Sequence, residues 1–128
     1  MRTNAAAAPA KQGARPLDAR DLAAYRPVVR EPLRMRYRGR DLYSMPPPSS
    51  GGGLLAEALA VLGGWEVGRL DRTGPTVAHA LTETLKAVFA DRASFYGDPA
   101  FASVPLRRLL TPAHATTIRE RIDFRRAR

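Results

Sequence analysis

The 128-residue chain contains no cysteine. This absence excludes disulfides, thiolate-bound zinc, iron–sulfur clusters and a cysteine nucleophile. Long hydrophobic runs are missing too: the apolar stretch 54–62 is about half of the roughly 20 residues that a membrane-spanning helix requires, and Glu57 interrupts it. Residues 1–13 lack the apolar stretch of a secretory signal. We therefore expect neither a membrane span nor an export signal in this chain. The absence of cysteine does not indicate a particular cellular compartment.

Acidic residues are scarce relative to basic ones: 12 Asp and Glu stand against 21 Lys and Arg, which gives a net charge of +9. Such an excess can attract nucleic acid or an anionic membrane surface. Only Lys11 and Lys86 are lysines, however, and the arginines are spread over the whole chain instead of forming one stripe. We interpret the charge as a solvated background and keep a small basic nucleic-acid-binding protein as an alternative function.

The chain is short enough to be one small domain or a part of a larger one. Residues 1–15 are rich in alanine and charge without apolar periodicity, which is typical of a disordered lead-in. We expect the folded segment to span residues 16–124, and the tail 125–128 to fray.

A short helix and a hairpin are predicted first. Asp18 is a favourable N-cap for a helix over 19–25, and Pro27 prevents its continuation. Residues 33–37 alternate between apolar and basic side chains, as in a half-buried strand. A second strand, 40–45, follows after a two-residue turn.

The turn residues Arg38 and Gly39 set the register of this hairpin. Met35 then faces Leu42 on the inner side. On the outer side Arg36 faces Asp41, and we expect the two to form an ion pair.

Prolines and glycines fill the segment 45–53, where we expect an extended, polyproline-like path and a cap from Ser49 or Ser50 for the next helix. That helix ends at Gly63-Gly64, and a longer one runs over 76–95 after an irregular link over 65–75. Two short helices, 105–110 and 112–122, each open with a proline. The predicted apolar stripes comprise Leu54, Leu55, Ala58, Leu59 and Leu62 in the first of these helices, and Val77, Ala80, Leu81, Thr84, Leu85, Val88 and Phe89 in the second.

Few residues could carry catalysis. His79 and His114 are the only histidines, and Glu83 is the only carboxylate at helical i+3 or i+4 spacing from either. We interpret His79 and Glu83 as a surface hydrogen bond, and predict no metal site and no cofactor. Thr116 and Thr117 lie inside a predicted helix, whereas a threonine nucleophile that uses its own amine as base must be N-terminal.

The run Ser49 to Gly53 is the best local candidate for anion binding, because glycine-rich backbone at a helix start offers free N–H groups. It lacks the lysine of a phosphate loop, so we interpret it as a tight turn plus a cap. Further along, Asp91-Arg92 suggests an ion pair and Asp98-Pro99 a locked turn.

Three stretches in this order carry a family resemblance: YRGRDLYSMPPPSSGGG (37–53), KAVFADRASFYGDPAFASVP (86–105) and RERID (119–123), with DLAAYRPVVREPL (21–33) upstream. Together they closely resemble the large subunit of γ-glutamyltranspeptidases, over roughly residues 13–127. The resemblance implies an α+β fold that is an incomplete portion of a four-layer αββα N-terminal-nucleophile hydrolase, with one β-hairpin and several helices. It also implies a family that is commonly exported, and in which a threonine passes the γ-glutamyl group of glutathione to water or an amino acid.

No catalytic or binding residue can be carried over from this family. Its nucleophile lies in a TTH motif beyond the region that matches RERID, and Ala115-Thr116-Thr117-Ile118 does not match that motif. Pro46 to Gly53 and Asp91 to Pro99 are assigned to scaffold. We expect a large-subunit fragment that is inactive without complementary large- and small-subunit segments, and that meets glutathione only in an assembled enzyme. The other alternative is a non-catalytic subunit that pairs with a separately encoded partner.

Overall fold

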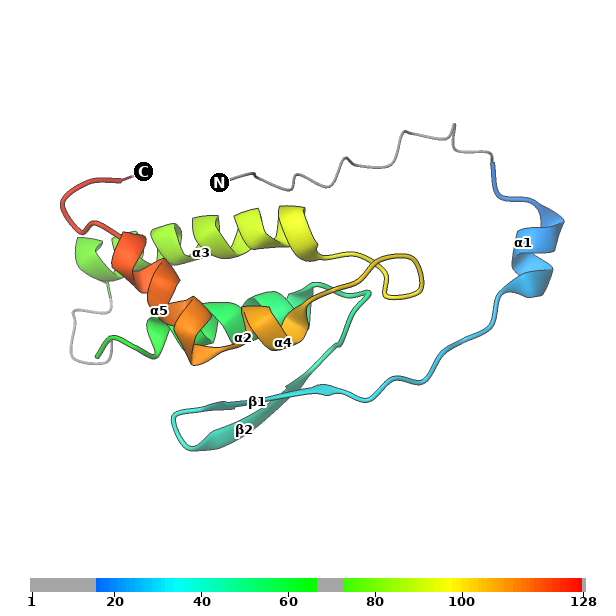
Figure 1. Ribbon diagram of the computed structural model, residues 1–128, viewed down its shortest axis with the longest axis horizontal. Coiled ribbons are helices and arrows are strands. Elements are labelled where there is room, and N and C mark those ends of the chain that lie inside the picture. Colours follow the sequence, from blue (N-terminus) through cyan, green and yellow to red (C-terminus); the bar gives the residue numbers. More distant parts are fainter. Residues whose placement is uncertain (1–15, 67–72, 128) are drawn as a thin grey trace.

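The computed structural model describes residues 16–66 and 73–127, so the predicted lead-in 1–15, part of the link 65–75 and Arg128 lie outside the described residues. Within them the chain is a mixed α+β arrangement of one antiparallel hairpin and several helices (Figure 1). The elements are α1 (Ala19–Ala24), β1 (Leu33–Tyr37), β2 (Arg40–Ser44), α2 (Gly51–Leu62), α3 (Pro75–Phe95), α4 (Leu106–Leu109) and α5 (Pro112–Arg121). None of the described helices is both long and apolar enough to cross a membrane.

Helix α1 begins where the sequence predicts, because Asp18 caps it. The Asp18 carboxylate accepts hydrogen bonds from the backbone N–H groups of Arg20 and Asp21 at 2.7 and 3.1 Å. The Asp21 carboxylate accepts one in return from the N–H of Asp18, at 3.0 Å, which completes a capping box. No residue of α1 is buried, and Figure 1 shows it away from the other helices, at the far end of an extended arm.

The hairpin has the predicted register, with Met35 opposite Leu42 and Arg36 opposite Asp41. Both turn residues have positive φ, 48° at Arg38 and 79° at Gly39, as a type I′ turn requires. The predicted Arg36–Asp41 ion pair is wrong: Asp41 instead pairs with Arg34, at 3.0 Å. Residues diagonally across two strands are close enough for a long side chain to reach, and arginine bridges that gap here.

The segment between β2 and α2 turns at Pro47 and Pro48, so the predicted extended path is wrong. The peptide bond between these two prolines is cis. A turn is needed because α2 packs back against the same hairpin. The predicted serine cap is also wrong. Ser50 occupies the N-cap position but its backbone is already helical, and its hydroxyl accepts from Nε of Arg92 at 3.0 Å instead of capping.

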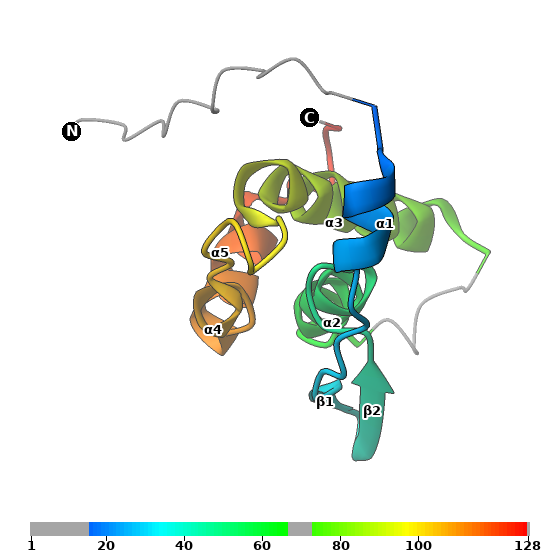
Figure 2. The same cartoon turned by 90° about the vertical axis from the view of Figure 1, so that its right-hand side faces the viewer.

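Helices α2, α3 and α5 pack against one another and hold the core (Figure 2). One buried cluster joins Val61 of α2 to Ala115 and Ile118 of α5. The buried hydrophobic residues among those described are Ala56, Ala58, Val61, Ala80, Val88, Leu109, Ala115 and Ile118. Four of these eight residues are alanines, so the helix backbones approach closely with little apolar volume between them.

The predicted apolar stripes are only partly buried. Leu55 is 47% exposed, and Leu81, Leu85 and Phe89 form an exposed face of α3 at i, i+4 and i+8. Thr84 of the second stripe is fully buried, and so is Glu57, which neither stripe includes. Helix α3 carries apolar residues on two sides, and within the described chain the other helices cover only one of them.

Helix α3 ends at Phe95 as predicted. Tyr96 leaves the helix with extended backbone, and Gly97 does not adopt a positive φ. The last two helices, α4 and α5, also begin and end close to the predicted positions. Thr111 caps α5 by accepting from the N–H of His114 at 3.2 Å.

Candidate functional site

Three ionisable side chains from three helices meet where α2, α3 and α5 pack. Nε2 of His114 on α5 lies 2.8 Å from Oδ2 of Asp91 on α3 and 3.2 Å from Oε1 of Glu57 on α2. Glu57 is fully buried, whereas the side chains of Asp91 and His114 are 20% and 19% exposed. We call these three residues the acid–imidazole cluster.

Burial makes a charge on Glu57 unfavourable. Desolvation raises the pKa of Glu57 from 4.5 to about 8, together with smaller contributions from Asp91. Asp91 acts through a hydrogen bond and through its negative charge. At neutral pH Glu57 therefore holds a proton in the folded chain.

Tyr96 borders the cluster from the residue after α3. Desolvation and the nearby Glu57 and Asp91 raise its pKa to about 12, so the phenol stays protonated. Its Oη is buried and has no hydrogen-bond partner among the described residues. The ring packs on Gly53, one turn before Glu57, where a Cβ would collide with the Tyr96 phenol. Gly53 is thus required for the close approach of α2 to the end of α3.

The predicted pair of His79 and Glu83 does not form. Nε2 of His79 lies 3.0 Å from the backbone oxygen of Asp123, and its ring contacts that of Phe124 at 5.7 Å between centroids. Glu83 accepts from Nζ of Lys86 at 2.8 Å. The two histidines therefore serve different contacts, and only His114 joins carboxylates.

The two threonines are held within α5. The Thr117 hydroxyl donates to the backbone oxygen of Ala113 at 3.1 Å, and the Thr116 hydroxyl accepts from Nη2 of Arg119 at 2.7 Å. Neither contacts a histidine ring, so the arrangement offers no activated nucleophile at these positions.

The predicted Asp91–Arg92 ion pair is wrong, because Asp91 turns to His114 and Arg92 to Ser50. Successive helical residues point in different directions, which separates them. The Asp98 turn is confirmed: Oδ1 of Asp98 accepts from the N–H of Ala100 at 2.9 Å, and its backbone oxygen accepts from the next two N–H groups.

The glycine-rich start of α2 is filled by protein. Gly52 and Gly53 are buried, and a Cβ on Gly52 would collide with the backbone oxygen of Met45. The predicted tight turn plus cap is therefore wrong, because Gly51–Gly53 form the first turn of α2, and the close packing leaves no room for an anion at Gly52 and Gly53.

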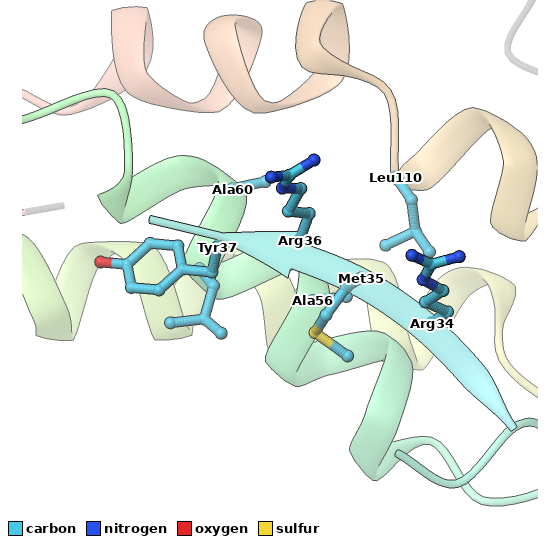
Figure 3. A pocket seen from close by; sticks show the side chains of 8 residues that line it. Arg34, Met35, Arg36, Tyr37, Ala56, Ala60 and Leu110 are labelled. Atoms are coloured by element: carbon cyan, nitrogen blue, oxygen red, sulfur yellow. The ribbon is translucent and has the colours of Figure 1, made fainter. Parts of the chain in front are cut away.

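A cavity of about 190 Å³ lies between β1 and α2 and reaches Leu110 (Figure 3). Arg34 and Arg36 line it together with Met35 and Tyr37 of the same strand. Its lining contains no carboxylate, histidine, serine or threonine, and the Tyr37 phenol is its only hydroxyl group.

A profile of the family described as Gamma-glutamyltranspeptidase matches residues 4–128. The Acylase ACY 1 proenzyme of Pseudomonas sp. (strain SE83) is 42% identical over 112 residues, which cover 88% of this chain and 20% of that protein. The Glutathione hydrolase proenzyme of Escherichia coli (strain K12) is 38% identical over 108 residues, covering 84% and 19%. Both relatives are named as proenzymes, and this chain belongs to the γ-glutamyltranspeptidase family.

Solved structures agree with this membership. The γ-glutamyltranspeptidase from Pseudomonas nitroreducens, complexed with L-DON, superposes with a TM-score of 0.81 at 32% identity, over 88% of this chain and 34% of that one. The Helicobacter pylori enzyme gives a TM-score of 0.77 at 36% identity, over 81% and 30%. The chain spans about a fifth of the length of the curated relatives it matches. It is therefore a fragment-sized member of a family of N-terminal-nucleophile hydrolases.

Sequence spacing could not reveal the acid–imidazole cluster. Glu57, Asp91 and His114 are separated by tens of residues and come from three helices, whereas helical spacing reports only neighbours on one helix. One signal was present: Glu57 interrupts an otherwise apolar run, and an acid inside such a run is a candidate for a buried polar contact.

Proposed function

We propose that this chain is a scaffold segment of a γ-glutamyltransferase or glutathione hydrolase and has no activity alone. A threonine held elsewhere in the assembled enzyme would attack the γ-glutamyl amide of glutathione and pass the acyl group to water or an amino acid. Membership of the family over residues 4–128 supports this proposal, together with the small share of the relatives that the chain matches.

One observation carries the proposal of inactivity. Within the described residues no serine or threonine hydroxyl contacts the ring of His79 or His114, and Thr116 and Thr117 are internal to α5. Nucleophilic catalysis needs such a contact or a free N-terminal amine. The matched segments supply support for a site rather than its reacting groups.

The hairpin supports the finer statement about architecture. In the described chain β1 and β2 pair only with each other, which leaves one open edge on each strand. We propose that these edges continue into a larger sheet, and that the helices form part of a covering layer of a four-layer αββα sandwich. A two-stranded sheet is only marginally stable by itself.

The test is hydrolysis of a γ-glutamyl anilide by the pure chain, before and after it is combined with the complementary large- and small-subunit segments of a relative. We expect no turnover above buffer for the chain alone and measurable turnover for the combination. Loss of turnover by the chain alone on Thr116→Ala or Thr117→Ala would contradict the proposal, because it would place the nucleophile in α5.

The basic binding protein has weaker support from the structure. Several arginines have intramolecular partners: Arg34 pairs with Asp41, Arg119 donates to the backbone oxygen of Ala60 at 3.0 Å, and the Arg108 guanidinium lies 4.4 Å from the centre of the Phe95 ring. A phosphate-binding surface would make affinity for nucleic acid fall steeply with salt. Measuring that salt dependence distinguishes the two functions.

A further inference from the structure

The acid–imidazole cluster brings three side chains of metal-ligating type together within the described residues. One ligand atom from each of Glu57, Asp91 and His114 lies within 4.8 Å of the other two. Each residue comes from a different helix, so the cluster lies at the point where α2, α3 and α5 converge.

The cluster leaves acceptor atoms unsatisfied. Oε2 of Glu57 is buried without a hydrogen-bond partner, in a side chain with no exposed surface. Nε2 of His114 faces two carboxylate oxygens, at 2.8 and 3.2 Å, but a neutral ring nitrogen carries at most one proton to donate. Oε2 of Glu57 is thus a buried oxygen that no group of the described residues satisfies.

No described lysine or arginine compensates for these carboxylates. Arg92, next to Asp91 in the chain, donates to Ser50, and Lys86, on the same helix, pairs with Glu83. The cluster therefore needs a positive charge from outside the chain or a shared proton.

Two carboxylate oxygens and one imidazole nitrogen form a donor set that suits Zn²⁺ and its neighbours in the first transition series. Bonds of about 2.1 Å hold the ligand atoms of a tetrahedral ion roughly 3.4 Å apart. The observed separations of 2.8 and 3.2 Å are close to that spacing, and small side-chain rotations would reach it. The exposed edges of Asp91 and His114 provide a route for the ion and a position for water.

We propose that Glu57, Asp91 and His114 bind one divalent transition-metal ion, with Zn²⁺ as the best match. The ion links α2, α3 and α5 through one ligand from each. Its role is structural, because it joins three packed helices and, among the described residues, no serine or threonine hydroxyl contacts the ring of His114. This site is independent of the γ-glutamyl chemistry proposed above.

The experiment uses the full chain, freed of metal by a chelator and titrated with Zn²⁺ at about pH 7 by isothermal titration calorimetry. We expect saturable binding of one ion per chain and a higher melting temperature by circular dichroism. Asp91→Asn and His114→Ala should each weaken binding at least about tenfold. His79→Ala is the matched control, since it removes the other histidine and should leave the affinity unchanged.

Cobalt provides a readout that does not depend on a variant's stability. Co²⁺ bound in place of Zn²⁺ should give the visible absorption of a four-coordinate site, and Zn²⁺ should displace it. Absence of saturable binding by the unmodified chain would overturn the proposal and favour a shared proton. Equal loss of affinity in His79→Ala and His114→Ala would overturn it too, because the ion would then bind histidines without this site.

Discussion

Glu57 shows how one residue can couple the fold to pH. Its pKa rises from 4.5 to about 8 on folding, because of burial and the neighbouring Asp91. Between these two values the folded chain holds a proton that the unfolded chain releases. The free energy of unfolding contributed by this group is therefore largest below pH 4.5 and falls as pH rises toward about 8.

In chelator-containing buffer, we expect urea unfolding to show less stability at about pH 8 than at about pH 5, by at most about 1.4 kcal/mol per pH unit for this one group. Glu57→Gln should flatten that dependence. Glu120→Gln, on the exposed side of α5, is the control and should keep it. An unchanged slope in Glu57→Gln would show that other groups dominate.

The space around the glycines at the start of α2 leads to a second prediction. A Cβ at Gly52 would collide with the Met45 backbone oxygen, whereas one at Gly51 meets only the Ser49 hydroxyl at 3.7 Å, an ordinary contact. Gly52→Ala should lower the free energy of unfolding by about 1–3 kcal/mol, because backbone must shift. Gly51→Ala should be neutral or stabilise by up to about 1 kcal/mol through helix propensity. Similar values for the two variants in urea unfolding would refute the close approach.

At the level of single residues, local chemistry was predictable and long-range chemistry was not. The Asp18 cap and the Asp98 turn depend on atoms within a few residues, so the sequence was sufficient to predict them. The partners of Asp41 and Arg92 depend on side-chain reach across elements, and there the predictions failed.

Among the elements, the hairpin offers a test of turn chemistry. Arg38 adopts a φ of 48°, which is unfavourable for a residue with a Cβ but better tolerated by asparagine. Arg38→Asn should therefore raise the free energy of unfolding by about 0.5–1 kcal/mol. Arg36→Asn, at an exposed strand position, is the control and should not stabilise. A destabilising Arg38→Asn would show that the contact of the Arg38 guanidinium with the Tyr37 ring, at 5.3 Å, matters more than the turn.

Element boundaries were predicted well because the residues that begin and end helices, such as proline, act locally. Helix α3 begins at Pro75 and α5 at Pro112. The orientation of the helices was not. Leu81, Leu85 and Phe89 share one face of α3, and periodicity alone cannot tell which of two apolar faces a neighbouring helix covers.

For the whole molecule, that exposed face of α3 predicts behaviour in solution. Leucine and phenylalanine at 38–55% exposure along one helix form an apolar surface that binds dyes and promotes association. Replacing Leu81, Leu85 and Phe89 together by lysine should reduce fluorescence of the dye ANS and shift sedimentation toward monomer, while far-UV circular dichroism stays helical.

A matched control comes from a buried position of the same helix, next to that face. Val88 is completely buried, so Val88→Lys should unfold the chain and increase dye binding. If the triple variant loses its helical signal as Val88→Lys does, the face is part of the core rather than a surface left for the rest of a family member.

The alanine-rich core sets how sharply this chain can unfold. Small side chains expose little apolar area on unfolding, so the heat capacity change and the sensitivity to urea should both be low for a chain of this length. The unfolding entropy scales with chain length, so in a chain of 128 residues each kcal/mol gained from a bound ion or a docked segment should move the melting temperature by several degrees. The melting temperature of this chain should therefore report binding of an ion or a docked segment clearly.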